Sequence, residues 1–104
     1  MKSLTPKELA EKQAKGEKLF VLDVREDDER AAGHIPDTLH IPMGSVPLRL
    51  NEIPEDIPVV VYCKAGGRSL RVAEFLATSG RTNIINLEGG VIRWAADVAP
   101  LVRG

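Results

Sequence analysis

The residues best suited to chemistry form one short segment, Cys63-Lys64-Ala65-Gly66-Gly67-Arg68-Ser69. Cys63 directly follows Val59-Val60-Val61-Tyr62, an apolar run typical of a buried strand. The segment leads into a predicted helix, whose first turn presents unpaired N–H groups and a partial positive charge. Gly66 and Gly67 let the backbone curl, also with positive φ, so that several N–H groups point at one sulfur or one bound anion.

Two full positive charges, on Lys64 and Arg68, stand beside the thiol. Each of these features favours thiolate over thiol, and cysteines placed in this way have pKa values lowered to roughly 3.5–7.5. The segment therefore predicts an ionised, nucleophilic Cys63 at neutral pH. The alternative interpretation is a buried, inert core residue, as most free cysteines are.

Strand and helix patterns alternate around this segment. Thr5-Pro6-Lys7-Glu8 combines a capping box with proline at the first helical position. Besides residues 59–62, strands are predicted over residues 19–24, 39–41 and 83–87. Helices are predicted over residues 5–15, 26–32, about 47–51, 69–78 and from residue 89 through Trp94.

This alternation predicts an α/β fold with a mainly parallel sheet. Ligands of such sheets bind at the carboxyl ends of the strands, where Cys63 stands. A length of 104 residues predicts one domain, residues 1–104.

Composition narrows the classes of function. Fourteen basic and 15 acidic residues give a formal charge of −1, which offers no general field for nucleic acid or an anionic membrane. One cysteine and two histidines do not make a zinc site, so we expect no metal and no cofactor. The polar start lacks a secretory signal, and no apolar run approaches the ~20 residues that cross a bilayer. A free thiol then favours a reduced, cytoplasmic setting.

Four segments resemble motifs of the rhodanese family and occur in the family's order over nearly the whole chain. They are Leu22-Asp23-Val24-Arg25; Glu29 with Gly33-His34-Ile35-Pro36; Cys63 to Ser69; and Leu87-Glu88-Gly89-Gly90 with Trp94. The resemblance implies a rhodanese-like, doubly wound, mostly parallel five-stranded sheet flanked by helices. Asp37-Thr38 departs from the Gly-Ala usual after the proline, but aspartate tolerates the left-handed turn. Arg30 stands where an aromatic residue is common.

The resemblance also implies a sulfurtransferase of the thiosulfate sulfurtransferase type. Cys63 takes sulfane sulfur from a small anionic donor such as thiosulfate, and its persulfide passes the outer sulfur to cyanide or a thiol. Residues Lys64, Ala65, Gly66, Gly67, Arg68 and Ser69 form the substrate-binding loop. No general base is required if Cys63 is already ionised. The alternatives are a sulfur-relay or binding module that exchanges persulfide with a protein partner, and a scaffold without chemistry.

Supporting roles are expected for three further residues. Asp23 and Arg25 are expected to pair or brace the loop rather than contact substrate, with Arg25 kept as a candidate rim cation. His34 is expected to be a hydrogen-bonded structural residue rather than a proton donor. Four residues separate Cys63 from Arg68, whereas the related phosphatases and arsenate reductases have five, so the loop favours binding of sulfur over phosphate.

Overall fold

The computed structural model describes residues 1–104 and contains a five-stranded sheet. Its strands are β1 (Lys2–Leu4), β2 (Phe20–Asp23), β3 (Leu39–His40), β4 (Val59–Tyr62) and β5 (Ile84–Leu87), in the order β1-β5-β4-β2-β3. All neighbouring strands are parallel, which confirms the predicted α/β class. β1 was not predicted, because it has three residues at the sheet edge and two of them are exposed.

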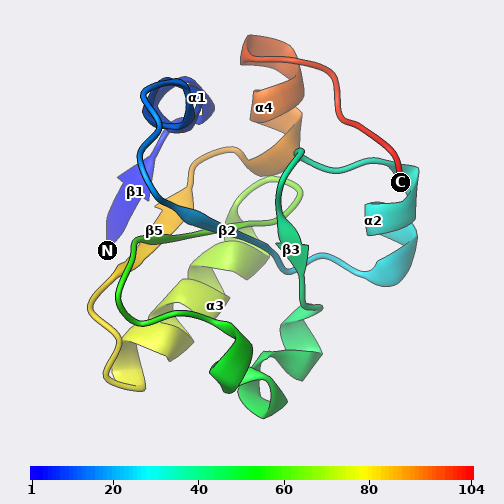
Figure 1. Cartoon of the computed structure of the whole chain (residues 1–104). Helices are drawn as coiled ribbons and strands as arrows, with labels where there is room; N and C mark the ends of the chain where they lie inside the picture. The colour runs from blue at the N-terminus through cyan, green and yellow to red at the C-terminus, as the bar shows by residue number, and fades with distance from the viewer.

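Helices cover both faces of the sheet, so the fold is doubly wound (Figure 1). On one face lie α1 (Pro6–Ala14) and α4 (Gly90–Asp97), which bury a cluster around Leu9, Val60 and Trp94. On the other face lie α3 (Gly67–Thr78) and the 3₁₀ helix η1 (Met43–Leu48), which cover a second cluster that includes Cys63. The short helix α2 (Asp27–Ala32) stands beside β3, at the end of the sheet (Figure 1).

The connection from α2 to β4 departs most from the sequence predictions. The helix predicted over residues 47–51 is wrong, because two 3₁₀ helices, η1 and η2 (Leu50–Glu52), occupy this region. Pro47 lies inside η1, where it has no N–H to donate and its ring prevents a longer α-helix. The turn at Asp37 is as predicted, with a left-handed φ of 61°.

The order of the strands reverses between β2 and β4. From β2 the chain passes outward to β3, whereas from β4 it passes to β5 on the opposite side. Loops that follow two such strands diverge and leave a crevice, which is the usual ligand site of an open parallel sheet. The Asp23–Arg25 segment and the Cys63 loop therefore flank the same point.

A buried polar network fixes the strand ends at this point. Both carboxylate oxygens of Asp23 accept hydrogen bonds from the Arg25 side chain, at 3.0 and 2.9 Å, and Arg25 also donates to the Gly33 carbonyl. The Tyr62 hydroxyl donates to Asp23 at 3.0 Å, which ties the end of β4 to the end of β2. Burial raises the pKa of Asp23, but the hydrogen bonds from Arg25 outweigh burial and hold that pKa below its usual value.

No helix has the length and apolar character that crossing a bilayer requires.

We expect Asp23→Asn to destabilise the fold by about 3–5 kcal/mol, because it leaves the Arg25 charge buried without its partner. Urea denaturation followed by circular dichroism measures the change in the free energy of unfolding. Asp56→Asn, at an exposed position, serves as the control and should stay within about 0.5 kcal/mol of the parent. Equal destabilisation by the two substitutions would show that the Asp23 network does not hold the strand ends.

Candidate active site

The loop between β4 and α3 turns sharply around the sulfur of Cys63. Gly66 is the N-cap of α3 and has a left-handed φ of 116°, which favours glycine. Gly67 is already the first helical residue, so the helix begins two residues before the predicted start at Ser69. The expectation that both glycines adopt special conformations is therefore corrected, since only Gly66 does.

Hydrogen-bond donors from the loop and the helix start surround the sulfur. The Gly66 N–H donates to Cys63 Sγ at 3.1 Å. Burial raises the pKa of Cys63, but the Ser69 hydroxyl and the N–H groups of Ser69, Gly66 and Ala65 outweigh burial and lower that pKa. Cys63 is only 1% exposed. Burial alone would suit an inert core cysteine, but such a residue has no need of an N–H group directed at its sulfur.

The N-terminus of α4 holds the loop in this shape. The Val91 N–H donates to the Cys63 carbonyl at 3.0 Å, and the Ile92 N–H donates to the Lys64 carbonyl at 3.2 Å. With these two carbonyls bound on the α4 side, the following N–H groups are free to face the sulfur. A Cβ on Gly90, whose φ is 53°, would overlap both carbonyl oxygens. The Gly89-Gly90 pair was the sequence signal for this close approach, but its contact with the loop was not predicted.

Arg68 does not supply a free positive charge, which corrects the sequence-based expectation. Its guanidinium donates to both carboxylate oxygens of Glu29 in α2, at 2.7 and 2.8 Å. This pairing with Arg68 lowers the pKa of Glu29 to about 2. The ion pair braces α3 against α2 and balances the Arg68 charge, so the fixed N–H dipoles carry more of the task of holding an anion.

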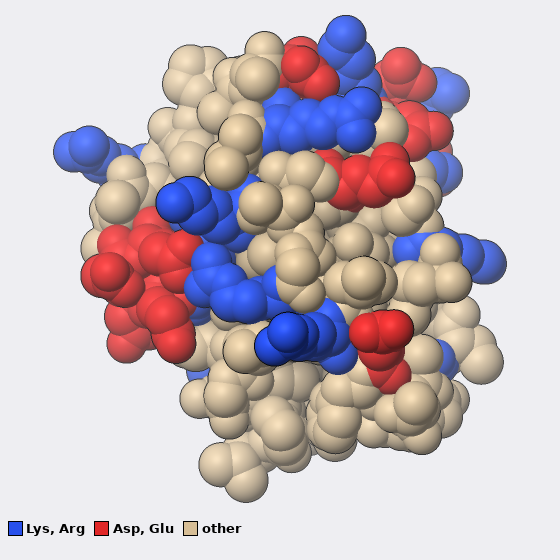
Figure 2. All heavy atoms as spheres, turned by 180° about the vertical axis from the view of Figure 1, so that it is seen from behind, with Lys and Arg blue, Asp and Glu red and all other residues tan.

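Of the three expected basic groups, Lys64 alone is exposed and without an ion pair. Arg25 is 4% exposed and bonded to Asp23, so it is not a rim cation. Figure 2 shows basic side chains as a band across one face of the molecule, next to a cluster of acidic ones. Positive charge is therefore gathered in one region of the surface and balanced by acidic side chains beside it, in agreement with the formal charge of −1 over the whole chain.

His34 makes its contacts away from the sulfur. Its ring nitrogens lie 2.9 Å from the Ile35 carbonyl and 3.1 Å from the Gly104 carbonyl, and its backbone bridges to Val102. These contacts tie the C-terminal segment to the turn before β3. They agree with a structural histidine and give it no link to the Cys63 loop.

A polar pair that the sequence did not reveal lies beneath the loop. The Ser69 hydroxyl donates to Asn86 Oδ1 at 2.7 Å, and the Gly66 carbonyl lies 3.1 Å from the same hydroxyl. Ser69 is fully buried and Asn86 is 8% exposed. Asn86 lies in β5, which the chain reaches only after α3, so no local pattern predicts the contact. No group of three or more His, Cys, Asp and Glu side chains is arranged to hold a metal ion.

Comparison with known proteins agrees with this architecture. The family model described as "Rhodanese-like domain" matches residues 5–97. This chain belongs to the rhodanese-like domain family. Its relatives include the "Sulfurtransferase" of Allochromatium vinosum, 40% identical over 94 residues that cover 90% of this chain and 88% of the relative. The "Thiosulfate sulfurtransferase GlpE" of Pseudomonas entomophila is 30% identical and is aligned over 89% of this chain and 84% of its own length.

Among solved structures, the crystal structure of a rhodanese-like domain protein from Staphylococcus aureus superimposes with a TM-score of 0.90. Its sequence is 35% identical to this chain, and the superposition covers 100% of this chain and 99% of the Staphylococcus aureus chain. The rhodanese-like assignment made from the four sequence motifs is therefore confirmed, and so is the five-stranded, helix-flanked fold that it implied.

A matched pair of substitutions tests the conformation of this rhodanese-like loop. Gly66→Ala strains a left-handed residue and turns its N–H away from the sulfur, so the pKa of Cys63 should rise toward the free value of ~8.5. Gly67→Ala adds a methyl group to open space at a helical position and should leave that pKa unchanged. The pH dependence of the rate of alkylation by iodoacetamide measures both. If the two variants give the same profile as the parent, the Gly66 N–H has no part in stabilising the thiolate.

Proposed function

We propose that this protein is a sulfurtransferase that carries sulfane sulfur as a persulfide on Cys63. The observation that supports the proposal is the placement of Cys63 Sγ, which lies at the carboxyl end of the central strand β4 and 3.1 Å from the Gly66 N–H. The donors around the sulfur lower the pKa of Cys63, and thiolate is the form that attacks sulfur. The sulfurtransferase names of the relatives agree with this chemistry.

Loading of sulfur follows from the charge on Cys63. The Cys63 thiolate attacks the sulfane sulfur of thiosulfate, and a new S–S bond forms. The bond between the two sulfurs of thiosulfate breaks, and sulfite leaves with the electron pair. The N–H groups of the loop stabilise the negative charge on the attacking sulfur and on the persulfide that replaces it. No proton is removed in this step, so no general base is needed.

Discharge of sulfur restores the starting state. Cyanide or a thiolate attacks the outer sulfur of the Cys63 persulfide, and the bond between that sulfur and Sγ breaks. Cys63 leaves as a thiolate, which the same N–H groups receive. The sum of the two steps moves one sulfur atom from donor to acceptor and requires no oxidant, reductant, metal or cofactor.

Thiosulfate is the donor that we propose for the test of this cycle. The relative from Pseudomonas entomophila is named as a thiosulfate sulfurtransferase. In this chain Lys64, the residue after Cys63, is an exposed cation, and the inward-facing N–H groups add partial positive charge. Together they attract a small dianion, although Glu29 neutralises Arg68.

Intact-protein mass spectrometry after treatment with thiosulfate provides the direct test. The protein should gain one sulfur atom, and addition of cyanide should remove it with formation of thiocyanate. Cys63→Ser, which keeps a similar shape without the thiol, should show neither change. An unmodified parent protein after thiosulfate and also after an organic persulfide would contradict the proposed persulfide chemistry.

A further inference from the structure

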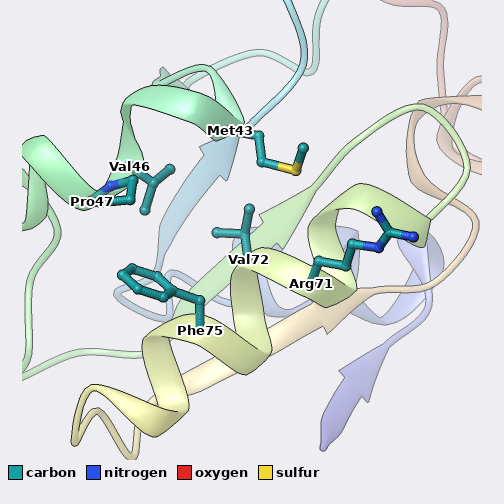
Figure 3. Close-up of a pocket in the computed structure, with 6 residues that line it drawn as sticks. All are labelled: Met43, Val46, Pro47, Arg71, Val72 and Phe75. Carbon is teal, nitrogen blue, oxygen red and sulfur yellow. The ribbon is translucent and has the colours of Figure 1, made fainter.

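An apolar pocket opens between η1 and α3, close to the Cys63 loop. Its volume is about 130 Å³, similar to a cavity that holds one benzene-sized apolar group. The lining residues are Met43, Val46 and Pro47 from η1, and Arg71, Val72 and Phe75 from α3. In Figure 3, Met43 and Arg71 lie on the side nearer the loop, and Pro47 and Phe75 lie on the far side. We call this feature the α3–η1 groove.

The groove is within reach of the sulfur. Val46 and Val72 belong to the same buried apolar cluster as Cys63. Gly66, whose N–H contacts Sγ, precedes Arg71 by five residues and Phe75 by nine. With a rise of 1.5 Å per residue, the groove extends from about 7 to about 14 Å from the loop along α3.

The groove also carries an unsatisfied positive charge. Arg71 is exposed and forms no ion pair, whereas Arg68, one turn earlier on the same side of α3, is bound to Glu29. Phe75 is 38% exposed at the far end. The surface next to the sulfur therefore offers a pocket for one apolar side chain and, between that pocket and the loop, a cation for one carboxylate.

We propose that the α3–η1 groove docks the protein partner with which Cys63 exchanges sulfur, a deduction that rests on the proposed function. An inorganic donor or cyanide has no group to fill an apolar pocket about 10 Å from the sulfur. A segment in polyproline II conformation advances about 3.1 Å per residue with three residues per turn, so an apolar side chain three residues from a reacting cysteine lies on the same side as that cysteine and reaches the groove. An acidic residue between them meets Arg71. The partner's thiolate attacks the outer sulfur of the Cys63 persulfide and leaves as a persulfide, while Cys63 leaves as a thiolate.

Two acceptor peptides test the docking proposal, acetyl-Leu-Asp-Gly-Cys-amide and acetyl-Ala-Asn-Gly-Cys-amide. The persulfide-loaded protein is mixed with each peptide, and the rate constant of discharge is divided by that for cyanide with the same variant. The first peptide should be faster by roughly tenfold, which corresponds to about 1.4 kcal/mol, because the groove removes part of one leucine side chain from water.

Arg71→Glu and Phe75→Ser should each reduce this preference by at least half. Leu70→Ser should keep it, because Leu70 is also 38% exposed but does not line the groove. Equal rates with the two peptides, or a preference that survives in both groove variants, would overturn the docking proposal. Failure of cyanide to discharge the loaded parent would instead contradict the proposed function.

A separate observation concerns the polar pair beneath the loop. The Ser69 hydroxyl has one proton and lies within hydrogen-bond distance of two acceptors, Asn86 Oδ1 at 2.7 Å and the Gly66 carbonyl at 3.1 Å, and Ser69 is also among the causes that lower the pKa of Cys63. The Asn86 amide nitrogen Nδ2 makes no hydrogen bond. A half-turn of the side-chain amide therefore exchanges Oδ1 and Nδ2 without breaking any contact other than the one to Ser69, which Nδ2 then takes over. After rotation Nδ2 donates to Ser69 Oγ, and the hydroxyl proton is directed at the sulfur.

We infer that Asn86 is a positioning residue that directs the Ser69 hydroxyl toward the charged sulfur of Cys63. While Cys63 is a neutral thiol, Asn86 accepts the Ser69 proton. When the sulfur becomes a thiolate or a persulfide anion, the rotated amide keeps Ser69 Oγ satisfied while its proton turns to the sulfur. Without Asn86, the neutral acceptor left to the hydroxyl is the Gly66 carbonyl, which holds the proton away from the sulfur.

A double-mutant cycle read on the pKa of Cys63 tests this inference. Ser69→Ala and Asn86→Leu should each raise the pKa by about half a unit to one unit, the size expected for one hydrogen bond. The double variant should match Ser69→Ala alone, because Asn86 acts through Ser69. Asn86→Ala replaces Asn86→Leu if the larger residue impairs folding.

The control is Asn83→Ala, which removes hydrogen bonds to the Pro54 and Ile57 carbonyls from the residue just before β5. It should lower the melting temperature without moving the pKa. Lower stability of the Asn86 variants with an unchanged pKa, or additive shifts in the double variant, would overturn the inference.

Discussion

The structure depends on one electrostatic constraint, the placement of a negatively charged sulfur where little water reaches it. A buried charge without partners is strongly unfavourable, so protein donors must replace the missing water. Here these donors are mostly backbone N–H groups, which have fixed directions. Gly66 takes a left-handed conformation to aim its N–H at Sγ, and α4 binds the carbonyls of Cys63 and Lys64 on the opposite side. The close approach of α4 in turn requires the glycine at position 90.

Formal charges around the site act mainly as structural supports. Asp23 is wholly buried and accepts hydrogen bonds from Arg25 and Tyr62, so it joins the ends of the two strands that flank the crevice. The Glu29 carboxylate likewise accepts both hydrogen bonds from the guanidinium of Arg68 and joins α2 to α3. An anion at the loop therefore meets a net charge smaller than the sequence suggests. The N–H dipoles are short-ranged, and this arrangement favours a small anion seated against the sulfur over general attraction of acidic molecules.

The parts of this site that could be predicted from sequence are those built from neighbouring residues. The apolar run before Cys63 predicts β4, and the capping box at Thr5 predicts α1. The glycine-rich loop before α3 predicts donors around the thiol. The contacts that were missed join residues far apart in the chain: Glu29 and Arg68 are 39 positions apart, and Ser69 and Asn86 are 17 apart. Both pairs form because the sheet places α2, α3 and β5 around one loop, and no single segment records that placement. β1 was missed because three residues give no periodicity.

Burial of Sγ has different consequences in the two halves of the proposed cycle. As a thiolate, Cys63 is sheltered, so only a small or closely fitted donor reaches it. Once loaded, the outer sulfur extends beyond Sγ and becomes the atom that an acceptor meets. A lowered pKa raises the fraction of Cys63 that is ionised, but it also makes each thiolate a weaker nucleophile. The loss of nucleophilicity is smaller than the gain in ionised fraction, because the Brønsted coefficient is about 0.4–0.5. The same low pKa makes Cys63 a better leaving group when the outer sulfur is attacked. One set of N–H groups thus assists loading by ionising the attacking sulfur and assists discharge by stabilising the departing one, so neither step needs a catalytic group of its own.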